Sequence, residues 1–133
     1  MNSRPIPLRR FSGKGGLIGV LEKGRELPFE VNRVFYIHEI DELAVRGLHA
    51  NRSLEEVIIA LRGSCRMTLH DGRNEETVML DDPELALYIG PLTWKVFDRF
   101  TPDCLLLVMA SLPYEESDHL TDFQAFLKEV GES

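Results

Sequence analysis

The stretch from Cys65 to Leu80 reads CRMTLHDGRNEETVML. Apolar and polar residues alternate from Cys65 to His70, which is the period-two pattern of a strand that buries one face. Asp71-Gly72 follows as a tight-turn signal, and the strand-forming run Thr77–Leu80 comes after it. The stretch therefore predicts a β-hairpin.

Strand-forming runs continue on both sides of this hairpin. They cover residues 31–37, 57–61, 85–89 and 104–110, and Gly, Pro and Asp residues separate them. Many short strands with a turn about every ten residues predict an all-β fold, either a barrel or a jelly roll. The C-terminal segment instead has apolar residues at helical spacing, which predict a helix that begins at Ser117 or Thr121. These apolar residues are Leu120, Phe123, Phe126, Leu127 and Val130.

The composition excludes several classes of protein. The chain has 133 residues, 44% of them hydrophobic and 28% charged, and this length predicts a single domain over residues 1–133. Its net charge is -7, with a balance of +3 over residues 1–66 and -10 over residues 67–133. A net acidic chain is a poor nucleic-acid binder, because phosphate contacts need clustered positive charge.

Two further absences concern location. No apolar run approaches the ~18 residues of a membrane span, and the basic start of the chain lacks the apolar core of a secretory signal. We therefore expect a protein that binds neither nucleic acid nor membrane. We expect its two cysteines, Cys65 and Cys104, to be buried and reduced.

The segment with the most chemical information runs from Arg46 to Glu56 and reads RGLHANRSLEE. In an all-β chain, His-x-His followed by Glu and then Gly is the first cupin motif, which holds a metal in many cupins. Here the second histidine is replaced by Asn51, and Lys95 stands where the second cupin motif places another histidine. A protonated lysine cannot bind a metal, and an amide oxygen is a weak ligand for a transition metal. We therefore expect no metal.

Several short motifs, taken in order, resemble the sugar 3,4-ketoisomerases, also called WxcM-like proteins. They are Arg33-Val-Phe-Tyr36, Arg46-Gly-Leu-His-Ala50, Gly63-Ser-Cys-Arg66, Leu87-Tyr-Ile-Gly-Pro91 with Trp94, and Asp103-Cys104. The resemblance covers residues 16–126. It implies a single cupin (RmlC-like) jelly-roll barrel with a C-terminal helix, and a cytoplasmic homodimer without metal or other cofactor. It further implies an isomerase that converts a dTDP-4-oxo-6-deoxyhexose to its 3-oxo isomer, in the biosynthesis of deoxyamino sugars for antibiotics or for surface polysaccharides such as lipopolysaccharide O-antigen.

The resemblance also suggests site residues. His49 matches the catalytic base, and histidine suits this task because its unperturbed pKa is about 6.5. The amide of Asn51 can donate a hydrogen bond to the reacting carbonyl, Lys95 can supply positive charge there, and Tyr36 can act as a second acid. The residues expected to bind the substrate are Arg33, Arg46 and Arg66 at the diphosphate, together with Glu55 and Trp94.

Other readings remain open at this point. A non-catalytic cupin that binds a nucleotide sugar, as a partner or regulator of a pathway enzyme, is favoured by Asn51 and Lys95 in place of histidines. A metal-dependent oxygenase has too few ligands. Trp94 is equally well read as a core residue, and His38, His70 and His119 are expected to be ordinary surface or partly buried residues.

Overall fold

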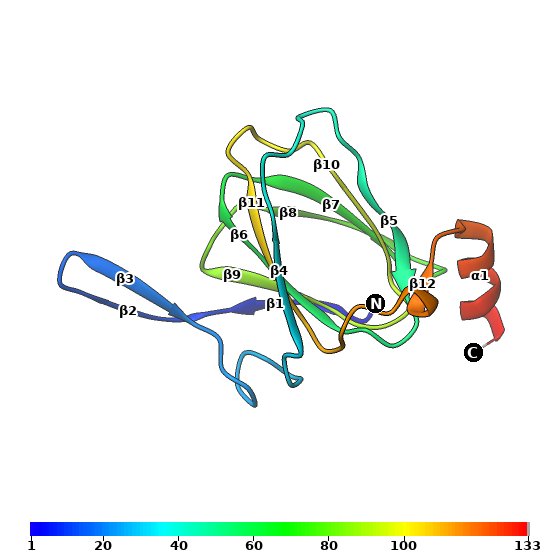
Figure 1. Ribbon diagram of the computed structural model, residues 1–133, viewed down its shortest axis with the longest axis horizontal. Helices are drawn as coiled ribbons and strands as arrows, with labels where there is room; N and C mark the ends of the chain where they lie inside the picture. Colours follow the sequence, from blue (N-terminus) through cyan, green and yellow to red (C-terminus); the bar gives the residue numbers. More distant parts are fainter. Residues whose placement is uncertain (133) are drawn as a thin grey trace.

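The computed structural model describes residues 1–132 and consists mainly of antiparallel strands (Figure 1). The first five-stranded sheet has the order β1 (Ser3–Pro7), β9 (Leu85–Ile89), β6 (Glu56–Arg62), β11 (Leu105–Ala110) and β4 (Arg33–Ile37). The second has the order β12 (His119–Leu120), β5 (Arg46–Asn51), β10 (Trp94–Asp98), β7 (Cys65–His70) and β8 (Glu75–Leu80). A separate hairpin contains β2 (Arg9–Gly13) and β3 (Gly16–Val20), and a 3-10 turn, Glu116–Asp118, precedes β12. The helix α1 (Phe123–Glu132) ends the chain.

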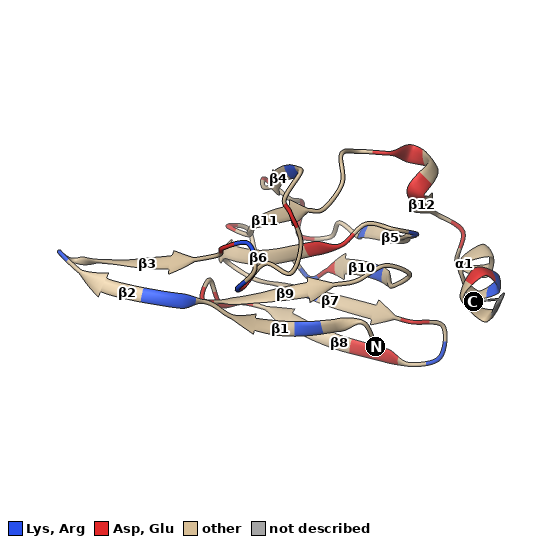
Figure 2. Ribbon diagram, turned by 90° about the horizontal axis from the view of Figure 1, so that it is seen from below, with Lys and Arg blue, Asp and Glu red and all other residues tan. Residues whose placement is uncertain are grey.

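The two five-stranded sheets form a jelly-roll sandwich, which confirms the predicted all-β fold with a C-terminal helix. Within residues 1–132 the sheets remain two layers, with edge strands β1 and β4 in the first and β12 and β8 in the second, so they do not close into the expected barrel (Figure 2). No helix of this described part is long and apolar enough to cross a membrane.

The core lies between the two sheets and follows from strand alternation. Cys65, Met67 and Leu69 of β7 are buried inside the sandwich, while the residues between them face outward. Both cysteines are free and buried, as predicted. Burial raises the pKa of the Cys65 thiol to about 12, so this thiol stays protonated at neutral pH.

The predicted hairpin is confirmed, because β7 and β8 pair from Cys65–Leu80 to His70–Glu75. Its turn is held by Asp71, whose Oδ1 accepts hydrogen bonds from the backbone N–H groups of Arg73 and Asn74. Strands also form in the other four predicted runs. Sequence reasoning missed the strands β1, β2, β3, β5, β10 and β12.

The helix begins later than predicted. It starts at Phe123, because the Oδ1 of Asp122 accepts a hydrogen bond from the backbone N–H of Gln124 and so caps the first turn. Ser117 lies in the 3-10 turn and Thr121 precedes the cap, so neither begins the helix. The apolar face of α1 packs on the outside of the second sheet, where Phe126 is fully buried against Trp94.

Candidate functional site

A cavity of about 340 Å³ opens between the two sheets. Arg33, Phe35 and Ile37 of β4 form one wall, because alternate residues of that strand face inward. The opposite wall comes from β5 and β10, and Tyr114 and His119 close one side. The cavity therefore joins polar groups from both sheets with the segment that leads to the helix.

A β-bulge positions His49 in this cavity. The pairing of β5 with β10 shifts by one residue between Lys95–His49 and Val96–Gly47, and Leu48 is the extra residue. Gly47 and Leu48 both have positive φ, of 81° and 55°. A Cβ on Gly47 would lie 2.7 Å from the carbonyl oxygen of Lys95, so only glycine fits there. The bulge re-aims the strand and places His49 and Asn51 on the cavity side.

The hydrogen bonding of His49 fixes its tautomer. Its Nδ1 lies 3.0 Å from the carbonyl oxygen of Gly47, which can only accept, so Nδ1 carries the proton and Nε2 carries the lone pair. Burial lowers the pKa of His49 below 6.5, and the positive charge of Lys95 lowers this pKa further. The ring is therefore neutral, and thus able to act as a base, at neutral pH.

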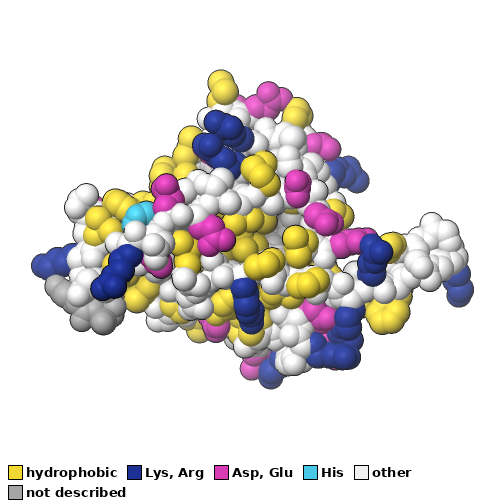
Figure 3. All heavy atoms as spheres, turned by 180° about the vertical axis from the view of Figure 1, so that it is seen from behind, with side chains coloured by type: hydrophobic (Ala, Val, Ile, Leu, Met, Phe, Trp, Pro, Cys, Tyr) yellow, Lys and Arg dark blue, Asp and Glu magenta, His cyan; other side chains and the backbone are white. Residues whose placement is uncertain are grey.

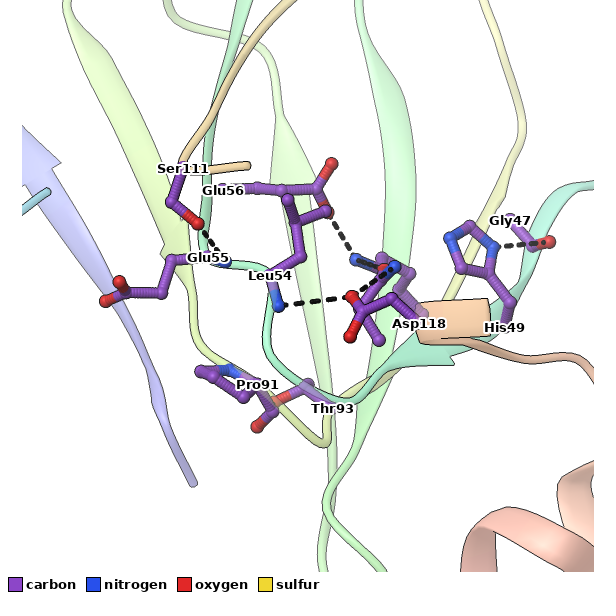
Figure 4. A network of polar contacts seen from close by, with 11 residues as sticks. Gly47, His49, Leu54, Glu55, Glu56, Pro91, Thr93, Ser111 and Asp118 are labelled. Carbon is purple, nitrogen blue, oxygen red and sulfur yellow. Dashed lines mark hydrogen bonds and ion pairs between the residues drawn. The ribbon is translucent and has the colours of Figure 1, made fainter. Parts of the chain in front are cut away.

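A buried polar network lies next to His49 (Figure 4). The ammonium of Lys95 forms an ion pair with Glu56 and also donates to the Oδ1 of Asn51 at 3.1 Å. The amide Nδ2 of Asn51 donates in turn to Asp118 at 3.3 Å, and Asp118 also accepts from the backbone N–H groups of Ser53 and Leu54. Lys95, Glu56 and Asn51 are all buried. Since an ammonium has three N–H donors, these two contacts leave one donor of Lys95 for another acceptor.

Arg33 and Arg46 also line the cavity. The guanidinium of Arg33 lies over the rings of Phe35 and Tyr114, with distances of 5.0 and 5.6 Å from its central carbon to the ring centroids. Its Nε is buried and has no hydrogen-bond partner among the described residues. A buried donor without a partner is costly, so Arg33 is suited to binding an anion that enters the cavity.

Four of the predicted site residues lie outside the cavity, for reasons of strand alternation. Tyr36 faces outward from β4 and is 65% exposed. Trp94 faces outward from β10 and packs against Phe123 and Phe126 of the helix. Arg66 faces outward from β7 and pairs with Asp98 on the neighbouring strand.

The fourth of these residues, Glu55, is replaced in the cavity by its neighbour. Glu55 accepts a hydrogen bond from the hydroxyl of Tyr88 at 2.6 Å and points away from His49 (Figure 4). Glu56 is the first residue of β6 and faces inward with Ile58. Glu56 shares the parity of Ile58 and Ala60, whereas Glu55 shares that of Val57 and Ile59, which belong to a second buried cluster. Both faces of β6 are buried, so the sequence pattern alone does not distinguish the two glutamates.

Sequence reasoning also missed Tyr114 and His119 in the cavity. Tyr114 lies in the irregular segment after β11, and His119 begins the two-residue strand β12, which is too short for any periodicity to predict which side chains face inward. The remaining predicted residues, His49, Asn51, Lys95, Arg33 and Arg46, come together around one cavity.

Comparison with known proteins places this geometry in context. Residues 1–131 match the family model described as FdtA, WxcM-like, C-terminal. A TDP-4-oxo-6-deoxy-alpha-D-glucose-3,4-oxoisomerase of Aneurinibacillus thermoaerophilus is 34% identical over 130 residues, which are 98% of this chain and 94% of the relative.

Two solved structures are similar over nearly the whole chain. WlaRA, a TDP-fucose-3,4-ketoisomerase from Campylobacter jejuni, has 32% identity and a TM-score of 0.94, covering 97% of this chain and 96% of its own. A point variant of the 3,4-ketoisomerase QdtA from Thermoanaerobacterium thermosaccharolyticum, in complex with TDP-4-keto-6-deoxyglucose, has 34% identity and a TM-score of 0.94. That match covers 98% of this chain and 95% of the other.

Proposed function

The chain belongs to the FdtA, WxcM-like family, and from this premise we propose that it is an isomerase that moves the carbonyl of a TDP-linked 4-keto-6-deoxy sugar from C4 to C3. The observation that carries the proposal is the position of His49, whose Nε2 lone pair is available in a cavity that also holds the Lys95 ammonium. Those two groups are a base and an electrophile, which this reaction requires.

The reaction begins at the carbon next to the carbonyl. His49 removes the proton from C3, and an enediol forms between C3 and C4. A proton then returns to C4 while the carbonyl forms at C3. One base can perform both carbon transfers when they occur on the same face of the sugar.

The polar network stabilises the oxygen at which negative charge develops. Lys95 offers its third N–H to that oxygen, and the ammonium is worth more in this buried site than in water. Asn51 holds Lys95 through its Oδ1, and one of the two N–H groups of its Nδ2 donates to Asp118. The second N–H is the donor for the predicted direct contact between Asn51 and the carbonyl.

The two cavity arginines hold the diphosphate of the nucleotide. We expect Arg33→Met to weaken TDP binding by about 10- to 100-fold, because a hydrogen bond to a charged group contributes about 1.5–3 kcal/mol. Isothermal titration with TDP measures the change. Arg66→Met is the matched control, since Arg66 pairs with Asp98 outside the cavity and its loss should leave the dissociation constant unchanged. Equal weakening by both variants would contradict a specific role for Arg33.

Carbon NMR of the purified chain with TDP-4-keto-6-deoxyglucose tests the function. The expected result is loss of the C4 carbonyl signal and growth of a C3 carbonyl signal. Saturable binding with an unchanged sugar would instead support the non-catalytic binder, which the similarity to ketoisomerases does not favour.

We further propose a homodimer, supported by the projecting hairpin of β2 and β3. These strands pair only with each other within residues 1–132, and they carry the exposed apolar side chains Phe11, Leu17 and Ile18 (Figures 1 and 3). Val34 and Tyr36 are also exposed, on the open edge strand β4. A second copy that covers these surfaces would remove them from water.

Sedimentation equilibrium tests the assembly. The wild-type chain should have the mass of a dimer, and Ile18→Asp should shift the equilibrium toward the monomer, because a charge at this position would be buried in the interface. A monomeric wild-type chain would contradict the proposal. Met79→Asp, at an exposed position on β8, is the control and should leave the mass unchanged.

A further inference from the structure

A second imidazole, that of His119, lies beside His49 in the cavity. The two ring centroids are 5.0 Å apart. His119 reaches this place because β12 pairs with β5, which sets His119 opposite Asn51. Its ring also lies near that of Tyr114, at 5.4 Å between centroids. Both imidazoles therefore line the same cavity wall.

The two rings have the same tautomer. The Nδ1 of His119 lies 3.1 Å from the carbonyl oxygen of Glu115, which can only accept, so Nδ1 carries a proton. This leaves Nε2 of His119, like Nε2 of His49, as the nitrogen that exchanges a proton with a ligand. A carbonyl contact at Nδ1 also fixes the orientation of each ring.

The surroundings favour a single positive charge on this pair of rings over a positive charge on each ring. Burial and Lys95 lower the pKa of His49, and a positive charge on His119 acts in the same direction. His119 is partly exposed, so water can solvate a charge on its ring. The charged and titratable groups around the pair are Arg33 of β4, Arg46 of β5, Glu56 of β6, Lys95 of β10, and Tyr114, Glu115 and Asp118 of the segment before β12.

We propose that His119 is a second catalytic residue, the acid and base at the sugar oxygens, and this inference rests on the proposed function. In the first step, neutral His49 takes the C3 proton, the C3–C4 double bond forms, and protonated His119 gives its Nε2 proton to O4. In the second step, neutral His119 takes the proton from O3, the C3 carbonyl forms, and protonated His49 gives its proton to C4. Both rings return to their starting states, so atoms and charge balance.

Two substitutions separate proton transfer from packing. His119→Gln keeps a side-chain amide that can donate to the Glu115 carbonyl, and His119→Phe keeps a ring against His49 and Tyr114. We expect both variants to lower kcat by about 10²- to 10³-fold, the usual contribution of a general acid–base group, with KM within about threefold of wild type. His38→Gln, at an exposed position outside this cavity, is the control and should match wild type.

The outcomes distinguish this inference from the function on which it rests. A wild-type chain that does not turn over the sugar contradicts the proposed function and this role with it. An active wild-type chain, with wild-type kcat in either His119 variant, contradicts the role of His119 alone. A raised KM at unchanged kcat would make His119 a binding residue and also contradict the proposal.

Discussion

The substitution His49→Asn should abolish isomerisation while nucleotide-sugar binding persists. The Asn amide can still donate to the carbonyl oxygen of Gly47, as Nδ1 of His49 does at 3.0 Å, but it has no lone pair of suitable basicity for the C3 proton. We expect kcat to fall by at least about 10³-fold, within the range of a lost general base. Turnover is followed by NMR, and TDP affinity is followed by isothermal titration.

The TDP affinity of the His49→Asn variant shows whether its loss of turnover comes from a lost base or from a damaged cavity. A dissociation constant within about twofold of wild type would show an intact cavity, because we propose that Arg33 and Arg46, and not His49, bind the diphosphate. His38→Gln again serves as the control for loss of an imidazole elsewhere. Wild-type turnover in His49→Asn would remove His49 from the mechanism.

The substitution Glu56→Gln should strongly destabilise the fold. Lys95 and Glu56 form a buried ion pair, with side chains only 4% and 8% exposed, so neutralising Glu56 leaves a buried ammonium without its counter-charge. Loss of one partner of such a pair costs about 3–5 kcal/mol in the free energy of unfolding. For a chain of this size, a loss of that order lowers Tm by about 10–20 °C. Urea unfolding and calorimetry measure the two quantities.

A double substitution tests whether the unpaired charge of Lys95 causes the loss of stability. Adding Lys95→Met to Glu56→Gln removes the unpaired charge, and we expect it to restore most of the lost stability, because buried ion pairs are often replaced by apolar residues at little cost. Glu55→Gln, on the adjacent residue with its bond to the Tyr88 hydroxyl, should cost far less. Unchanged stability in Glu56→Gln would contradict the buried pair.

Much of the fold follows from period-two alternation in the sequence. The residues 65–70 predict a strand that pairs with β8, since their buried and outward side chains alternate without a break and Asp71-Gly72 forms the turn between the two strands. Strand β5 was missed because the bulge at Leu48 breaks this alternation. The helix start was placed too early, because Ser117, Thr121 and Asp122 are all good caps in sequence and only tertiary packing chooses among them.

Family motifs identified candidate site residues in the sequence. They did not show which of these side chains face the cavity, because that depends on the orientation of each strand. His49, Lys95 and Arg33 were found from motifs, whereas Tyr36, Trp94 and Arg66 carried similar motif evidence but face outward. The inward face of a strand is known only when its partner strands are known. His119 carried no local signal, because β12 comes beside β5 only in the folded chain. The expectation of a metal-free site stays a prediction.

Hydrogen exchange at C3 tests most directly whether His49 acts as a base on the sugar. The wild-type chain is incubated with TDP-4-keto-6-deoxyglucose in D2O, and the sugar is analysed by proton NMR and mass spectrometry. We predict loss of the C3 proton signal as the C3 carbonyl forms in the wild-type reaction, and deuterium at C4 to the extent that His49 exchanges its proton with solvent before returning it, with neither change in the His49→Asn variant. Retention of the C3 proton by wild type, with the nucleotide sugar bound, would contradict the assignment.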